Sequence, residues 1–182
     1  MGMNLFLINK VKENTQAFAD GVVSIAKQLG INPDWLMIVM NFESGLNPKA
    51  TNKNSNAVGL IQFMPKTAQG LGTTTNDLLN MSNVEQLHYV YKYLARYSGR
   101  IDSLTDLYLC IFYPVAVGKS DNYVLGTTEE NKKLVARLNK VFDTNSDGYL
   151  TKNEITQYIN NYALKLGYTG QTKSMNSKKK TY

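Results

Sequence analysis

The pattern of apolar and polar positions along the chain predicts helices far more than strands. Residues 10–29 repeat apolar side chains with the helical period, and Gly30 is suited to end that helix. The same period recurs in residues 83–97 and 103–112. Residues 57–64 are short and apolar, which fits either a strand-like segment or a buried turn. The sequence therefore predicts a mainly α fold with at most a small β element.

Residues 32–45 are apolar on most sides of the predicted helix, which is typical of a helix inside a core. Asn32 suits the N-cap, Pro33 the first helical position and Gly45 the end. Glu43 then occupies the last turn, where burial and the helix C-terminus both disfavour negative charge. These effects favour a protonated carboxyl, as a general acid requires. The alternative is a Glu43 side chain that reaches the surface.

Composition places the chain among globular proteins with one well-buried domain and a small appendage, because 182 residues include 43% hydrophobic and 19% charged residues. The net charge of +6 owes much to lysines after residue 169, so it is weak evidence for nucleic acid. The lone Cys110 excludes an internal disulfide and suits a core position. The apolar run near the N-terminus is too short for a secretory signal, and no stretch is long enough for a membrane helix.

Residues 143–154 match the twelve-residue loop of an EF-hand. Calcium takes six to eight oxygen ligands, which such a loop supplies by wrapping around the ion. The predicted ligands are Asp143, Asn145, Asp147, Tyr149 through its backbone carbonyl, Thr151 through its hydroxyl or a water, and Glu154 through two oxygens. Helical patterns in residues 131–142 and 155–166 flank the loop. Since only one such loop is present, we expect a structural calcium site, and the alternative is an interhelix turn without metal.

Four short motifs in the first half of the chain resemble those of the soluble lytic transglycosylase and goose-type lysozyme family. They are Glu43-Ser44-Gly45, Asn47-Pro48, Gly59-Leu60-Ile61-Gln62 and Pro65-x-Thr67-Ala68. The resemblance extends over about residues 20–125 and implies a lysozyme-like helical domain. It also implies cleavage of the β-1,4 bond between N-acetylmuramic acid and N-acetylglucosamine in peptidoglycan.

The resemblance implies that Glu43 protonates the glycosidic oxygen. The family then uses the N-acetyl group of the substrate and the same Glu as base on the muramoyl 6-hydroxyl, which gives a 1,6-anhydro product. No acidic residue occurs in residues 44–76, in keeping with a one-carboxylate route, although Asp102 or Asp106 could approach through folding. If water attacks instead, the same site is a lysozyme-type hydrolase.

The family pattern assigns substrate contacts to Ser44, Gln62, Tyr113 and Tyr123. Pro114 stands where the family commonly has Asn in an A-Y-N-A-G segment, so the shape of that sugar subsite differs. A catalytically weak, calcium-dependent cell-wall-binding module is therefore a competing hypothesis to the enzyme.

The predicted organisation is a catalytic domain at residues 1–126, an EF-hand helix-loop-helix packed on it at 127–168, and a disordered basic tail at 169–182. The expected partner is the peptidoglycan glycan strand, with no nucleic acid and no membrane span. We expect a monomer, unless the chain is part of a phage or secretion assembly. It would act in the bacterial cell wall or periplasm, delivered by a bacteriophage or an export machine because no signal peptide is visible.

Overall fold

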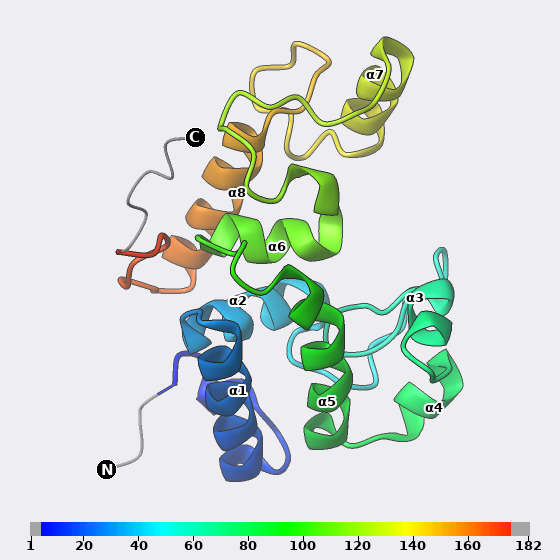
Figure 1. Cartoon of the computed structure of the whole chain (residues 1–182), viewed down its shortest axis with the longest axis vertical. Coiled ribbons are helices and arrows are strands. Elements are labelled where there is room, and N and C mark those ends of the chain that lie inside the picture. Colours follow the sequence, from blue (N-terminus) through cyan, green and yellow to red (C-terminus); the bar gives the residue numbers. More distant parts are fainter. Residues whose placement is uncertain (1–4, 176–182) are drawn as a thin grey trace. The chain divides into compact units, whose positions relative to one another are not determined.

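The computed structural model of the chain describes residues 5–175, which are mainly helical, as the sequence predicts. In this part of the chain β structure is limited to isolated bridges. The chain divides into two compact units, and the boundary falls between Gly99 and Arg100. Each unit forms around its own set of helices (Figure 1).

The first unit is held together by α1, which packs against both α2 and α5 (Figure 1). The buried side chains of α1 include Phe18, Val22 and Ile25, which recur at the helical period. The elements of this unit are η1 (Ile8–Lys10), α1 (Thr15–Leu29), α2 (Pro33–Ser44), α3 (Pro65–Gly70), α4 (Thr75–Asn80), α5 (Asn83–Leu94) and η2 (Ala95–Tyr97).

Local sequence signals set both ends of α2. The side chain of Asn32 accepts a hydrogen bond from the N–H of Asp34 at 2.9 Å, and Pro33 occupies the first position. At the other end Gly45 adopts a φ of +63°, which glycine adopts readily, and its N–H donates to backbone carbonyls of the last turn. All residues from 35 to 41 are buried. The predicted buried helix is confirmed.

The second unit contains α6 (Leu104–Phe112), η3 (Pro114–Ala116), α7 (Glu129–Leu138) and α8 (Lys152–Lys165). In this unit α6 packs against η3 and α8. Phe142 joins the aromatic side chains of these helices, with its ring centroid 4.6 Å from that of Tyr158 and 5.2 Å from that of Phe112. Such ring pairs each contribute about 0.5–1.5 kcal/mol beyond their area burial.

The helices differ from the prediction in several places. The first long helix begins at Thr15 rather than Lys10, because Asn14 has a φ of +51° that a continuing helix cannot include. The helix before the EF-hand-like loop is Glu129–Leu138 rather than 131–142. The six-residue α4 was not predicted, although Thr74 caps it by accepting from the N–H of Asp77.

The segment after α8 differs in part from the predicted disordered tail. Among its described residues, the carbonyl oxygen of Thr172 accepts from the N–H of Leu104 at 2.9 Å. The N–H of Ser174 donates to the carbonyl oxygen of Asp102 at 2.8 Å. Residues 172–174 therefore pair with residues 102–104, where α6 begins, whereas residues 176–182 of the predicted tail lie outside the described residues.

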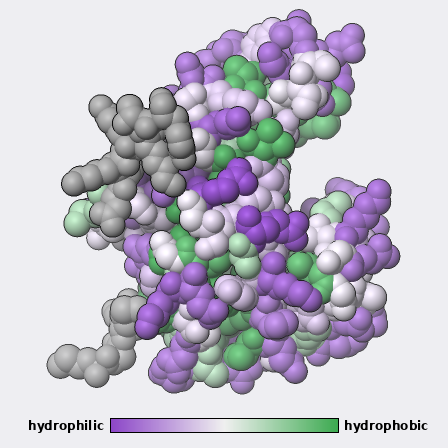
Figure 2. All heavy atoms as spheres, in the orientation of Figure 1, coloured by the Kyte–Doolittle hydropathy of each residue, from purple (hydrophilic) through white to green (hydrophobic). Residues whose placement is uncertain are grey.

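The face drawn in Figure 2 is covered mainly by hydrophilic residues, with apolar residues scattered between them. None of the helices in residues 5–175 combines the length and the apolar character that crossing a membrane requires.

Candidate functional site

Glu43 lies in the last turn of α2, one residue before the helix ends. Its side chain is half-buried, and burial raises the pKa of its carboxyl from 4.5 to about 7. The carboxyl is therefore close to half-protonated at neutral pH, so it can both give and take a proton there.

Ser44, the next residue, connects α2 to a second motif of the sequence. Its hydroxyl oxygen lies 2.9 Å from the carbonyl oxygen of Met40 and 2.9 Å from that of Leu60. One O–H donates to one of these acceptors at a time, so the hydroxyl alternates between them or is shared. The predicted contact of Ser44 with sugar stays a prediction, and the structure gives the residue a structural role as well.

Residues 59–62 form a tight turn that holds Gln62. Val58 and Phe63 flank it and exchange two backbone hydrogen bonds of 3.1 and 2.8 Å. Gln62 has a φ of +55°, and its amide nitrogen donates to the carbonyl oxygens of Gly59 at 3.1 Å and Ala50 at 3.3 Å. No described residue donates to its Oε1. Gln62 is therefore held by its nitrogen, and its oxygen is left to accept from a ligand hydroxyl.

Gln86, a fully buried glutamine on α5, forms hydrogen bonds that fix the same turn. Oε1 of Gln86 accepts from the N–H of Leu60 at 3.0 Å, and Nε2 donates to the carbonyl oxygens of Pro48 at 2.7 Å and Leu78 at 2.8 Å. A Cβ at Gly59 would lie 2.5 Å from the same Oε1. Sequence reasoning missed Gln86, since a single polar residue on an apolar helix face gives no sign of what it binds.

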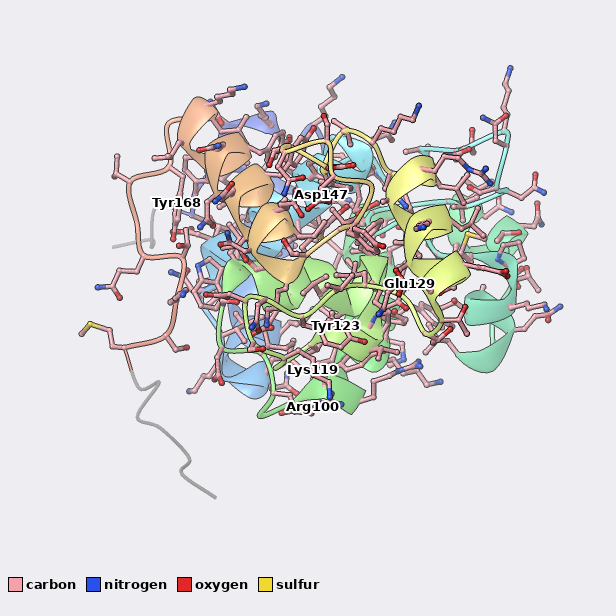
Figure 3. The ribbon with its side chains drawn as sticks, turned by 90° about the horizontal axis from the view of Figure 1, so that it is seen from above. Arg100, Lys119, Tyr123, Glu129, Asp147 and Tyr168 are labelled. Atoms are coloured by element: carbon pink, nitrogen blue, oxygen red, sulfur yellow. The ribbon has the colours of Figure 1, made fainter. Side chains whose placement is uncertain are left out.

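Tyr113 and Tyr123 belong to the second unit. The N–H of Tyr113 donates to Leu109 at 2.9 Å and ends α6, and Pro114 then takes the first position of η3. Proline suits that position because no N–H is needed there. The side chain of Tyr123 lies near Lys119 (Figure 3), with Nζ 5.8 Å from the ring centroid. Glu43, Ser44 and Gln62 thus come from the first unit and the two tyrosines from the second.

The EF-hand-like loop has a network of side chain to backbone hydrogen bonds. Asp143 Oδ2 accepts from the N–H of Gly148 at 3.1 Å, and Asn145 Oδ1 accepts from that of Asp147 at 2.9 Å. The two oxygens of Glu154, the last residue of the loop, accept from the N–H groups of Thr144 at 3.2 Å and Thr151 at 2.9 Å. The Glu154 carboxylate therefore connects the start of the loop to its end.

One buried side-chain oxygen of this loop has no hydrogen-bond partner among the described residues. Oδ1 of Asp143 is buried and receives no hydrogen bond within the described residues. A buried carboxylate oxygen that accepts no hydrogen bond is costly unless a cation binds it. The other candidate ligand atoms of the loop are all oxygens, which suit a hard cation. In the described part of the chain no three His, Cys, Asp or Glu side chains are gathered as a metal site. Glu154 instead caps α8, where its side chain and that of Thr151 form a reciprocal capping box.

A buried ion pair joins Lys152, a residue of this loop, to Asp106 at the start of α6. Nζ of Lys152 donates to Asp106 Oδ1 at 2.7 Å and to the carbonyl oxygen of Lys119 at 2.8 Å. Both side chains are almost fully buried, with 7% and 6% of their surface exposed. The Asp106 carboxylate also accepts from the N–H groups of Gly118 and Asp102. Sequence reasoning missed this pair because its members are 46 positions apart.

Residues 22–115, more than half of the chain, match the transglycosylase SLT domain family. The matched residues include Glu43, Ser44, Gln62 and Tyr113, whereas Tyr123 and the EF-hand-like loop lie beyond them. The family indicates lytic transglycosylase-type action on the peptidoglycan of the cell wall. The chain belongs to the transglycosylase SLT domain family.

Proposed function

We propose that the chain is a lytic transglycosylase that cleaves the β-1,4 bond between N-acetylmuramic acid and N-acetylglucosamine with Glu43 as its one catalytic carboxyl. The observation that carries this proposal is the half-buried Glu43 at the end of α2, inside the residues that match the family, with a pKa of about 7. Such a carboxyl exists in both protonation states at neutral pH, and the reaction uses both.

In the proposed reaction the protonated carboxyl of Glu43 donates its proton to the glycosidic oxygen. The bond between that oxygen and C1 of the muramoyl sugar breaks, and the oxygen leaves as a hydroxyl of N-acetylglucosamine. The N-acetyl group of the substrate stabilises the oxocarbenium-like C1. The Glu43 carboxylate then removes the proton of the muramoyl 6-hydroxyl, and O6 forms a bond to C1. The product is a 1,6-anhydro sugar, and Glu43 is protonated again.

The environment of Asp106 supports a route with one carboxylate. The two-carboxylate scheme of most glycosidases needs a second acid as nucleophile or base. No acid occurs in residues 44–76, and the carboxylate of Asp106 is taken up by Lys152 and two backbone N–H groups. Removal of such a buried charge from its partners is costly, so Asp106 suits a structural role.

The proposed sugar contacts follow the family pattern. Gln62 would accept from a sugar hydroxyl through Oε1, since its nitrogen already donates to backbone carbonyls. Ser44 would act near the N-acetyl group or the carboxyl of Glu43. Tyr113 and Tyr123 would contact the glycan from the second unit. Of these, Tyr123 lies beyond the residues that match the family.

We further propose that residues 143–154 bind one structural calcium ion. The ligands would be Asp143, Asn145, Asp147, the Tyr149 carbonyl, Thr151 and Glu154. The unpartnered buried Oδ1 of Asp143 supports this site, as does a donor set made only of oxygens. The ion would supply fixed positive charge to the loop, and the chain's own residues would perform the reaction. Delivery by a phage or an export machine stays a prediction.

Product analysis tests the proposal. Purified protein is incubated with peptidoglycan sacculi, and the released muropeptides are analysed by mass. Muropeptides with 1,6-anhydro ends, lighter by one water than reducing ends, are the expected result. Reducing ends would show a lysozyme-type hydrolase with the same site. Binding to sacculi without release would favour the non-catalytic wall-binding module.

A further inference from the structure

Residues 118–125 of the second unit are joined to the EF-hand-like loop at several points. The N–H of Leu125 donates to the carbonyl oxygen of Leu150 at 2.8 Å, and the N–H of Lys152 donates to that of Tyr123 at 2.9 Å. Val124 and Thr151 form an antiparallel bridge between these two bonds. The segment therefore pairs with the loop as a short antiparallel bridge.

The Lys152 side chain fixes an earlier part of the same segment. Its ammonium group donates to the carbonyl oxygen of Lys119 and to Asp106, and Asp106 in turn accepts from the N–H of Gly118. Lys152 directly follows Thr151 and precedes Glu154 by two residues, so it lies within the loop. A movement of the loop backbone here necessarily moves the ammonium group and the residues that it binds.

The buried charges of Lys152 and Asp106 have few alternative partners. Both members of the pair are more than nine-tenths buried, so neither can exchange its partner for water without a large desolvation penalty. The segment that is joined to the loop carries Tyr123 (Figure 3).

We propose that calcium in the loop sets the conformation of residues 118–125, and that Lys152 is the positioning residue that carries this coupling to Gly118 and Lys119. The inference rests on the proposed function, because it makes the glycan contact of Tyr123 dependent on the proposed calcium ion. By thermodynamic linkage, glycan binding and calcium binding then strengthen each other by the same factor.

Hydrogen exchange on the full chain tests the coupling, with and without calcium. In the wild type calcium slows exchange at least tenfold in the loop and throughout residues 118–125. In Lys152→Met calcium still slows exchange in the loop and at residues 121–125, which backbone bonds from Asn153 to Asp121, from Lys152 to Tyr123 and from Leu125 to Leu150 hold, but no longer at residues 118 and 119. Lys165→Met, an exposed lysine on α8, is the matched control and behaves like the wild type.

A second variant is needed because Lys152→Met leaves Asp106 buried without its charged partner, which can prevent folding. Lys152→Met combined with Asp106→Asn removes both charges and keeps a side-chain oxygen that can accept from Gly118. This double variant is expected to fold and to show the same selective loss at residues 118 and 119.

Calcium affinity is also measured with and without an N-acetylglucosamine oligomer. If Lys152 had a purely structural role, its substitution would not change the effect of the oligomer on calcium affinity. The oligomer is expected to tighten calcium binding about fivefold or more in the wild type and not in the double variant. Calcium protection confined to residues 143–154, or calcium affinity indifferent to the oligomer, would overturn the inference and leave the calcium site standing. Absence of calcium binding in calorimetry would overturn the inference and the calcium site together, while cleavage by Glu43 would be unaffected.

Discussion

The hydroxyl oxygen of Ser44 lies 2.9 Å from the carbonyl oxygen of Leu60, and this contact joins the end of α2 to the turn that holds Gln62. Glu43 precedes Ser44 in the chain, so the contact also fixes the helix end that carries the proposed acid. The contact therefore connects two sequence motifs through residues that are 16 positions apart.

Ser44→Ala tests this connection. The variant loses a side-chain hydrogen bond to the backbone, and the free energy of unfolding should fall by about 1 kcal/mol. Cleavage of sacculi should slow because the turn with Gln62 is no longer fixed to α2. Urea unfolding and muropeptide release measure the two effects. Ser24→Ala, an exposed serine in α1, is the control and should change neither; equal behaviour of the two variants would contradict the role of Ser44.

Gly59→Ala tests the fit between the turn and Gln86. Gly59 has a φ of +81°, and an added Cβ would approach Oε1 of Gln86 to 2.5 Å. Strain and clash together should lower the free energy of unfolding by about 2–4 kcal/mol. Gly45→Ala is the matched control, since Gly45 also has a positive φ but no atom within 4 Å of a new Cβ. It should cost less than Gly59→Ala, and an equal cost would show that the contact with Gln86 contributes nothing.

The raised pKa of Glu43 predicts a specific dependence of stability on pH. Between about pH 4.5 and 7 the folded chain keeps a proton on Glu43 that the unfolded chain has lost. The free energy of unfolding should therefore fall as pH rises through this range, by about 3 kcal/mol from this residue. Glu43→Gln cannot titrate, so the difference between variant and wild type should grow over the same window. A difference that stays constant from pH 4 to 8 would contradict a raised pKa.

Much of the fold was predictable because local signals agree with the packing. Asn32, Pro33 and Gly45 define α2 in the sequence, and each has the predicted role in the structure. The start of α1 was misplaced because the left-handed Asn14 is held by a contact with Asn83, 69 positions away. A short helix such as α4, with Leu78 as its buried residue, gives too few periodic positions to detect.

The candidate site was predictable only where its residues form motifs. Glu43, Ser44 and Gln62 were found because their spacing matches a family, and the EF-hand-like loop because its oxygens recur at fixed positions. Gln86, Lys152 and Asp106 belong to no local pattern, since their partners come from distant parts of their units. Such buried polar contacts are determined by tertiary packing, which spacing in the sequence does not reveal.

Calcium should stabilise the chain if the loop binds it. At a calcium concentration 100 times the Kd, the expected gain in the free energy of unfolding is about 2.7 kcal/mol, seen as a higher melting temperature. Glu154→Gln keeps an oxygen for the capping box but loses charge, so most of this gain should disappear. Thermal unfolding of both proteins in calcium and in chelator measures the effect. Identical unfolding curves for the wild type in the two solutions would contradict the proposed calcium site.

The release of muropeptides by Glu43→Gln tests the central claim most directly. The wild type and the variant are incubated with the same sacculi at pH 6 to 7, after circular dichroism has shown that both are folded. Because the amide introduced by Glu43→Gln cannot give or take the proton, release of 1,6-anhydro muropeptides should fall at least a thousandfold, about 4 kcal/mol in activation free energy. Release by folded Glu43→Gln at the wild-type rate would contradict the assignment of Glu43 as the catalytic acid.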